Sequence, residues 1–393
     1  MTRPSAASSP YLPLALPPCR LRAGRAPLPC RLRAGRARPP SERNTVMKLR
    51  ALAVVALLAT AGCQAPEPEP VRISCGSGPV TGQGSSAQTN AVNAWIKAYQ
   101  IACPEATVEY ASTGSGAGVR AFLTGTGDFA GTDTPLSTAD QAKADARCGT
   151  GPAVHLPLVA GPIALAYNVA GVDSLRLRPD TIARILSGRI TVWNDPAVAA
   201  DNQGVALPAT AIRVVHRSDD SGTTANVLAY LAVAAPSVWT HGTGSAWPLR
   251  GGDGRRGSHR VVAAIAGTDG AIGYVESSYA RVNDLPGVRV GTSDGRWADP
   301  TDHAAGLTIA AATVSGAGGD LRLAIDHTVT GGAYPIVSVT YEVVCRGSVS
   351  GVARSFLGYA ASEAGQEAAA NAGFAPLPPA LREQVVASVA ELG

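Results

Sequence analysis

The strongest constraint on the fold of this chain is the alternation of short apolar runs with helical patterns that follows residue 72. We predict strands at residues 107–110, 154–158, 163–168, 212–215, 271–275 and 336–344. We predict helices at residues 91–100, 180–186, 225–234, 261–266 and 350–363. This alternation is typical of α/β proteins with mostly parallel sheets. The stretch from Cys63 to Gly393 has 331 residues, which exceeds one average domain and indicates two lobes.

Residues 1–46 differ in composition from the rest of the chain. They contain two near-copies of an eleven-residue unit, beginning at Cys19 and Cys30, and they are rich in Pro and Arg. A segment of this kind cannot build a core. Two interpretations remain open. We favour sequence translated from an early start codon, because a better start follows at Met47; the alternative is a basic arm for nucleic acid or an anionic membrane surface.

A secretory signal is predicted at residues 47–62. Two basic residues precede the uncharged stretch 51–61, which is too short for a membrane-spanning helix of about 20 residues. The signal ends at Cys63 in a sequence similar to a bacterial lipobox, although Thr60 stands where an aliphatic residue is usual. We therefore predict export, lipidation of Cys63 and anchoring by lipid to the outer face of the cytoplasmic membrane. Residues 63–71, in which Pro alternates with Glu, are predicted to form a solvated tether.

The basic charge of the chain belongs to this N-terminal segment. Residues 1–62 hold 11 of the 33 Lys and Arg residues but only 1 of the 29 Asp and Glu residues. The remainder has 22 basic and 28 acidic side chains, a formal net charge of −6. An acidic exported chain argues against a nucleic-acid partner.

Four cysteines remain after the lipidation site, and they are Cys75, Cys103, Cys148 and Cys345. An even number of cysteines in an exported chain indicates two disulfides. Three pairings are possible, of which we favour Cys103–Cys148 with Cys75–Cys345. The sequence has no pair of cysteines at CxxC spacing and no HExxH motif, so we expect neither a metal site nor a cofactor.

Three loops place Gly and hydroxyl residues directly before a predicted helix. They lie at residues 82–88, 113–118 and 217–224, and the third also contains Arg217. The N-terminus of a helix offers unpaired N–H groups and a partial positive charge, and it therefore binds anions. A single loop of this type is more often an ordinary helix cap. None of the three matches a P-loop or a dinucleotide-binding motif, but together they indicate a site for a small oxyanion.

These loops, taken with residues 127–137 and 270–276, resemble the periplasmic phosphate-binding protein of the ABC phosphate importer. The similarity is greatest to lipoprotein forms from high-GC Gram-positive bacteria, and it extends from about Ile73 to Leu392. The resemblance implies an α/β periplasmic-binding-protein fold of two lobes joined by two crossovers, with the ligand between them. We expect lobe one to comprise residues 72–168 and 335–393, and lobe two residues 169–334.

The resemblance also implies which residues bind phosphate: Ser86, Ala87, Ser115, Asp133, Arg217, Ser221, Gly222 and Thr223. Asp219 is expected to orient Arg217 without contacting the anion itself. The sequence departs from the family pattern at three places. Ala87 stands where the family has Phe, Asp220 replaces a Gly and adds a negative charge close to the expected anion, and residues 259–260 are His-Arg where an acidic-Gly pair is usual.

The proton that phosphate keeps at neutral pH explains why such a site needs a carboxylate. Asp133 can accept a hydrogen bond from that proton, whereas sulfate has no proton to donate and would meet only a buried negative charge. Arg217 would supply one full positive charge in a geometry suited to two oxygens. Turn and cap roles for Asp133, or a surface ion pair between Arg217 and Asp219, are the simpler alternatives.

The resemblance thus implies a binding protein, expected to be monomeric, that binds inorganic phosphate and delivers it to ABC permease subunits with a cytoplasmic ATPase. A binder of sulfate or molybdate is the alternative within this class, and Asp133 argues against both. A secreted phosphatase with Ser115 or Ser221 as nucleophile is the alternative enzyme. No His or carboxylate has the spacing to activate either serine, so we predict no enzymatic activity.

Overall fold

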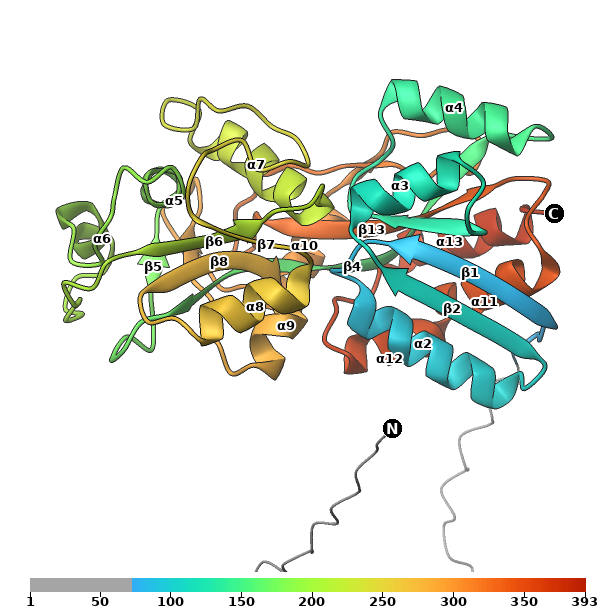
Figure 1. Cartoon of the computed structure of the whole chain (residues 1–393), viewed down its shortest axis with the longest axis horizontal. Helices are drawn as coiled ribbons and strands as arrows, with labels where there is room; N and C mark the ends of the chain where they lie inside the picture. Colours follow the sequence, from blue (N-terminus) through green and yellow to red (C-terminus); the bar gives the residue numbers. More distant parts are fainter. Residues whose placement is uncertain (1–72) are drawn as a thin grey trace, which may run out of the picture. The chain divides into compact units, whose positions relative to one another are not determined.

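The structure is a computed structural model that describes residues 73–393. The proposed start at Met47, the predicted signal peptide, the predicted lipidation site Cys63 and the predicted tether lie outside the described residues. An eight-stranded sheet forms the centre of the described part (Figure 1). Its strands lie in the order β2 (Ala106–Ser112), β1 (Gly78–Gly84), β3 (Phe129–Thr132), β13 (Val337–Cys345), β4 (Ala153–Asn168), β8 (Ala271–Glu276), β6 (Arg213–Arg217) and β7 (Asp253–Arg255).

Both outer parts of this sheet are parallel, as predicted, but the centre is antiparallel. β1 pairs in parallel with β2 and β3, and β6 pairs in parallel with β7 and β8. In contrast, β13 is antiparallel to β3 and β4, and β4 is antiparallel to β8. The prediction of mostly parallel sheets is therefore wrong for the two long central strands.

The two strands predicted at 154–158 and 163–168 form one continuous strand, β4. Its two prolines mark changes in pairing rather than breaks in the strand. The register against β13 shifts beside Pro157, which has no N–H to donate to the ladder. After Pro162 the strand leaves β13, and from Ile163 it pairs with β8.

Helices cover both faces of the sheet. In the view of Figure 1, α3 and α4 lie above β1 and β2 with α2 below them, and α7 and α8 lie above and below β6 and β8. The helices are α2 (Thr89–Ala102), α3 (Ser115–Leu123), α4 (Thr138–Cys148), α5 (Pro179–Leu186), α6 (Pro196–Asp201), α7 (Gly222–Ala234), α8 (Ser258–Ala266), α9 (Ser277–Val282), α10 (Asp302–Ala310), α11 (Gly351–Ala361), α12 (Glu363–Asn371) and α13 (Pro379–Ala390). The helix predicted at 350–363 ends at Ala361, because Ser362 caps the separate helix α12.

Two small sheets complete the secondary structure of the described part. One contains β10 (Trp297–Ala298), β9 (Arg289–Gly291) and β5 (Arg176–Leu177), and the other contains β11 (Thr313–Val314) and β12 (Leu323–Ala324).

The apolar residues form two large cores whose boundary crosses β4. Ala160 packs in the first core and Ile163 in the second. We call β1–β3, α2–α4 and α11–α13 the first half, and β5–β9 with α5–α9 the second half. Ala305 and Leu323 fall inside the segment predicted as lobe two, yet they pack in the first core. The lobe bounds given above therefore stay a prediction.

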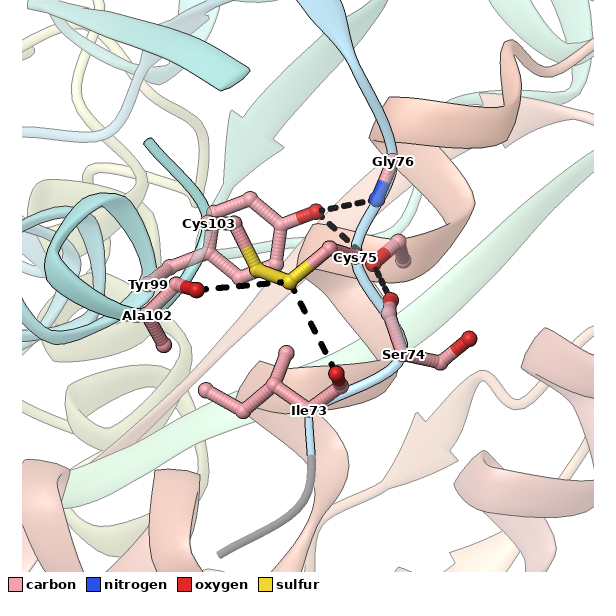
Figure 2. The surroundings of a disulfide bond; sticks show 8 residues. Ile73, Ser74, Cys75, Gly76, Tyr99, Ala102 and Cys103 are labelled. Carbon is pink, nitrogen blue, oxygen red and sulfur yellow. Dashed lines mark hydrogen bonds between the residues drawn. A yellow bond between two sulfur atoms is a disulfide. The ribbon is translucent and has the colours of Figure 1, made fainter. Parts of the chain in front are cut away.

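The disulfides join Cys75 to Cys103 and Cys148 to Cys345, so the favoured pairing was wrong. Figure 2 shows the first bond, which lies where the chain enters β1 and α2 ends. In a parallel βαβ unit the helix returns the chain to the start of the first strand, which brings its last turn next to the residues before β1. The second bond joins the end of α4 to the end of β13, where Cys345 lies opposite Ala153. The first disulfide therefore closes a local βαβ unit, whereas the second joins segments 197 residues apart in the sequence that the sheet brings together.

Candidate anion-binding site

The three predicted loops follow the carboxyl ends of β1, β2 and β6, and Asp133 follows the carboxyl end of β3. Ser86 follows β1, Asp133 follows β3, and Arg217 is the last residue of β6. In α/β sheets this edge is where ligands bind, because the loops after parallel strands meet there. The first turns of α3, α7 and α8 are directed to the same place, each preceded by a Gly or Ser that lets the helix begin abruptly.

Ser115 and Asp133 form the centre of this cluster. The Ser115 hydroxyl donates to Asp133 Oδ2 at 3.3 Å and accepts the Gly222 N–H at 3.2 Å. Thr223 Oγ1 also donates to Asp133 Oδ2 at 3.4 Å, and Thr340 Oγ1 donates to Oδ1 at 2.7 Å. All four side chains are at most 4% exposed. The Asp133 carboxylate is therefore a buried acceptor surrounded by hydroxyl donors from both halves of the molecule.

Gly222 is required for this approach of the two halves. A Cβ atom at this position would lie 2.5 Å from Asp133 Cβ and 2.8 Å from Ser115 Oγ, well inside contact distance. Ser221, directly before it, accepts the Thr224 N–H at 3.2 Å and so serves as the N-cap of α7. The first turn of α7 therefore presents the Gly222 N–H to Ser115 and the Thr223 hydroxyl to Asp133.

Arg217 and Asp219 form a buried two-pronged ion pair. Arg217 Nε donates to Asp219 Oδ1 at 2.8 Å, and Nη2 donates to Oδ2 at 2.7 Å. Burial alone would raise the pKa of Asp219. The hydrogen bonds and positive charge of Arg217, together with the Gly257 N–H, outweigh this effect, so the pKa lies below its ordinary value. The pair uses two of the five guanidinium N–H groups and leaves three for another partner. The Asp219 carboxylate thus fixes the direction of the Arg217 guanidinium, and its orienting role toward an anion stays a prediction.

Ser86 lies against a residue that the sequence analysis did not select. Its hydroxyl accepts the N–H of Ser258, the first residue of α8, at 3.1 Å, and the two hydroxyls share a hydrogen bond of 3.0 Å. Gly257 and Ser258 repeat the pattern of Gly and hydroxyl before a helix, which was the signal available for finding them. The Ala87 N–H, predicted as a phosphate donor, is hydrogen-bonded to Ser85 Oγ at 3.1 Å.

A second set of buried or partly buried polar side chains, Gln88, Tyr110 and Glu342, lies near Asp133. Gln88 Nε2 donates to the Tyr110 hydroxyl, which donates to the Ser85 carbonyl, each at 2.9 Å. Burial raises the pKa of Glu342 to about 8, with hydrogen bonding to Gln88 opposing the shift and the charge of Asp133 adding to it. The Glu342 carboxyl is thus mostly protonated near pH 7.

Asp220 does not lie among the buried side chains around Asp133. Its carboxylate accepts a hydrogen bond from Arg120 Nη1 at 2.6 Å at the partly exposed edge of the cluster. The added negative charge predicted for this position is therefore compensated by a cation from α3.

Within residues 73–393 no three His, Cys, Asp or Glu side chains are placed to hold a metal ion. The same residues contain no helix that is long and apolar enough to span a membrane. The chemistry of the cluster is that of hydroxyls, helix N-termini, one guanidinium and the carboxylates of Asp133 and Asp219.

The sequence matches the PBP superfamily domain over residues 70–364. It is 40% identical over 331 residues to phosphate-binding protein PstS 3 of Mycobacterium leprae, covering 81% of this chain and 88% of that protein. It is 42% identical over 318 residues to phosphate-binding protein PstS 2 of Mycobacterium tuberculosis, covering 78% and 85%. A solved phosphate-binding protein from Stenotrophomonas maltophilia has a TM-score of 0.61 at 21% identity, covering 79% and 94%.

The fold and the matched domain make this chain a member of the PBP superfamily, in agreement with the predicted periplasmic-binding-protein fold. Within that superfamily, identities of 40% and 42% over most of each chain show that it belongs to the family of the PstS proteins.

Proposed function

We propose that the protein binds inorganic phosphate between its two halves and delivers it to an ABC-type importer. The observation that carries the proposal is the buried cluster in which Ser115, Asp133 and Thr223 meet beside the Arg217–Asp219 pair. Its donors are mostly neutral hydroxyls and N–H groups. In a water-excluded site each such hydrogen bond is stronger than in water, so one guanidinium suffices for the anion.

Selectivity for phosphate is assigned to Asp133. A protonated oxygen of phosphate would donate to a carboxylate that is already fixed by Thr340 and Ser115. Sulfate offers no such proton, and its oxygens would be repelled by the buried charge. The same argument makes sulfate and molybdate the weaker candidates.

Binding is proposed to hold the two halves together. Ser86, Ser115 and Asp133 come from the first half, and Arg217 and residues 221–223 come from the second. An anion bound by both sets stabilises the closed arrangement, and separation of the halves about β4 and the segment before β13 releases it. This proposed hinge motion depends on the predicted site residues, which lie on both halves, and on the predicted lobe bounds.

Delivery requires a membrane partner. We propose that the closed form docks as a monomer on permease subunits whose ATPase lies on the cytoplasmic side, and that lipidation of Cys63 keeps the protein at the outer face of the membrane. The names of the PstS relatives support the transport role.

A phosphatase is the second function to test. A serine nucleophile needs an adjacent base that is strong enough to take its proton. Ser221 caps α7, and Ser115 donates only to the Asp133 carboxylate, which is an intrinsically weaker base than histidine and already accepts from Thr223 and Thr340. We therefore propose binding without chemistry on the ligand.

Calorimetric titration of the protein, stripped of phosphate, tests the proposal. We expect one phosphate to bind tightly per chain and excess sulfate not to displace it. Release of phosphate from p-nitrophenyl phosphate should stay at the background rate. Absence of phosphate binding, together with binding of another oxyanion, would refute the assignment of Asp133 and of the ligand.

A further inference from the structure

We infer that Arg120 and Asp220 form a latch across the mouth of the anion site that slows release of the bound anion. The inference rests on the proposed binding function and adds a device outside the group of predicted ligands. Arg120 lies in the last turn of α3 in the first half, and Asp220 lies between β6 and α7 in the second half. Their side chains meet at 2.6 Å, although the residues are 100 positions apart.

The backbone brings the two side chains together. The Gly116 N–H donates to the Asp220 carbonyl at 3.2 Å. A Cβ atom on Gly116 would lie 2.4 Å from Asp220 Cβ, so only glycine permits this approach. The loop that carries Asp220 therefore lies directly on the first turn of α3.

The pair stands between two surface hollows at the edge of the site. One hollow, of about 360 Å³, extends from Ser115 toward Gly244, and the other, of about 330 Å³, extends from Thr113 toward Arg256. Arg120 and Asp220 line both. Separation of the halves far enough to free an anion must therefore break this ion pair.

The position of Asp220 in the sequence ties the latch to the site. Asp219, which precedes it, orients Arg217, and Ser221, which follows it, caps α7. An uncompensated carboxylate here would repel the anion, and Arg120 removes that repulsion while joining the halves. Because both side chains are partly exposed, at 65% and 40%, the pair has the modest strength of a surface salt bridge.

A double-mutant cycle on phosphate dissociation separates an effect of the Arg120–Asp220 pair from a direct effect of the Arg120 charge on the anion. Stopped-flow release is measured for the wild-type protein, Arg120→Gln, Asp220→Asn and the double variant. In the wild-type background Arg120→Gln should raise the dissociation rate about two- to fivefold, the range for an exposed ion pair. In the Asp220→Asn background it should have almost no effect, because the partner is already gone. The difference should fade in high salt.

A direct charge effect of Arg120 on the anion would instead be the same in both backgrounds. Equal effects, or an unchanged rate in Arg120→Gln, would overturn the latch. Lys143→Gln is the matched control, since it removes the exposed Lys143–Asp140 pair within α4 and should leave the rate unchanged. If the wild-type protein binds no phosphate, small-angle X-ray scattering of the anion-free variants still tests the latch: Arg120→Gln should be the less compact, and identical profiles would refute it.

Discussion

Replacement of Asp133 with Asn tests the proposal that Asp133 accepts a hydrogen bond from the protonated oxygen of phosphate. The side chain is 3% exposed, and its oxygens accept hydrogen bonds from Ser115, Thr223 and Thr340. Asparagine keeps the size and one carbonyl oxygen, but it replaces the other acceptor with an N–H₂ group. The variant should therefore fold normally while changing what this position offers to the anion.

The expected magnitude follows from one hydrogen bond to a charged acceptor. Such a bond contributes about 1.5–3 kcal/mol, which corresponds to roughly a ten- to 150-fold change in affinity. Phosphate loses this bond in the variant. Sulfate escapes the repulsion of the carboxylate and can accept from the new N–H₂ group. The ratio of sulfate to phosphate dissociation constants should therefore fall by about tenfold or more.

Competition calorimetry at pH 7 measures both constants. The matched control is Asp326→Asn, an exposed carboxylate that accepts from Thr328 far along the chain from the site residues. Thermal melting checks that both variants are folded. An unchanged ratio in a folded Asp133→Asn protein would refute the assignment of selectivity to Asp133.

Three further predictions concern the surroundings of the site and the disulfides. Ser258→Ala should weaken phosphate binding about threefold to tenfold in calorimetry by removing the hydroxyl that meets Ser86, the cost of one hydrogen bond; equal affinity would show that Ser258 has no part in the site. The folded state keeps the Glu342 proton up to about pH 8, whereas the unfolded chain releases it near its ordinary pKa of 4.5, so this group stabilises the wild-type fold less as pH rises across that range. Glu342→Gln should therefore gain stability over wild type from pH 5 to pH 8.5 in urea unfolding, and a constant difference would contradict a neutral Glu342. Replacing both cysteines of a disulfide with serine should cost about 2–5 kcal/mol, more for the bond that spans 197 residues than for the one that spans 28; a larger loss for the shorter loop would contradict the chain-entropy reasoning.

Local pattern was sufficient to predict five of the eight strands of the central sheet, whereas β1, β3 and β7 were not predicted. The helical patterns at 91–100 and 225–234 correspond to α2 and α7, and the apolar run at 271–275 corresponds to β8. The continuity of β4 was missed because Pro157 and Pro162 normally end strands, whereas here each lies at a change of partner. Which strand pairs with which depends on tertiary packing that periodicity does not encode.

The site was predicted from motifs, and its omissions have physical causes. Ser258 carried a readable signal, because Gly257 precedes it and a helix follows. Thr340 carried none, since a threonine inside a buried strand is ordinary and only the antiparallel pairing of β13 with β3 brings it to Asp133. The disulfide pairing was missed for a related reason: sequence spacing ranks no pairing above another, whereas the βαβ geometry brings the end of α2 back to the start of β1.

Asp220 links these observations on sequence and site. Viewed by sequence alone, a carboxylate inside an anion loop is a defect that should lower affinity. In the structure it is paired with Arg120 and held by Gly116, so its charge contributes to closure at the edge of the site while Asp133 remains the acceptor within it. Under the proposed function the two carboxylates have different roles because they differ in burial. The buried Asp133 would discriminate between anions, and the partly exposed Asp220, screened by water and salt, would affect how long the anion stays.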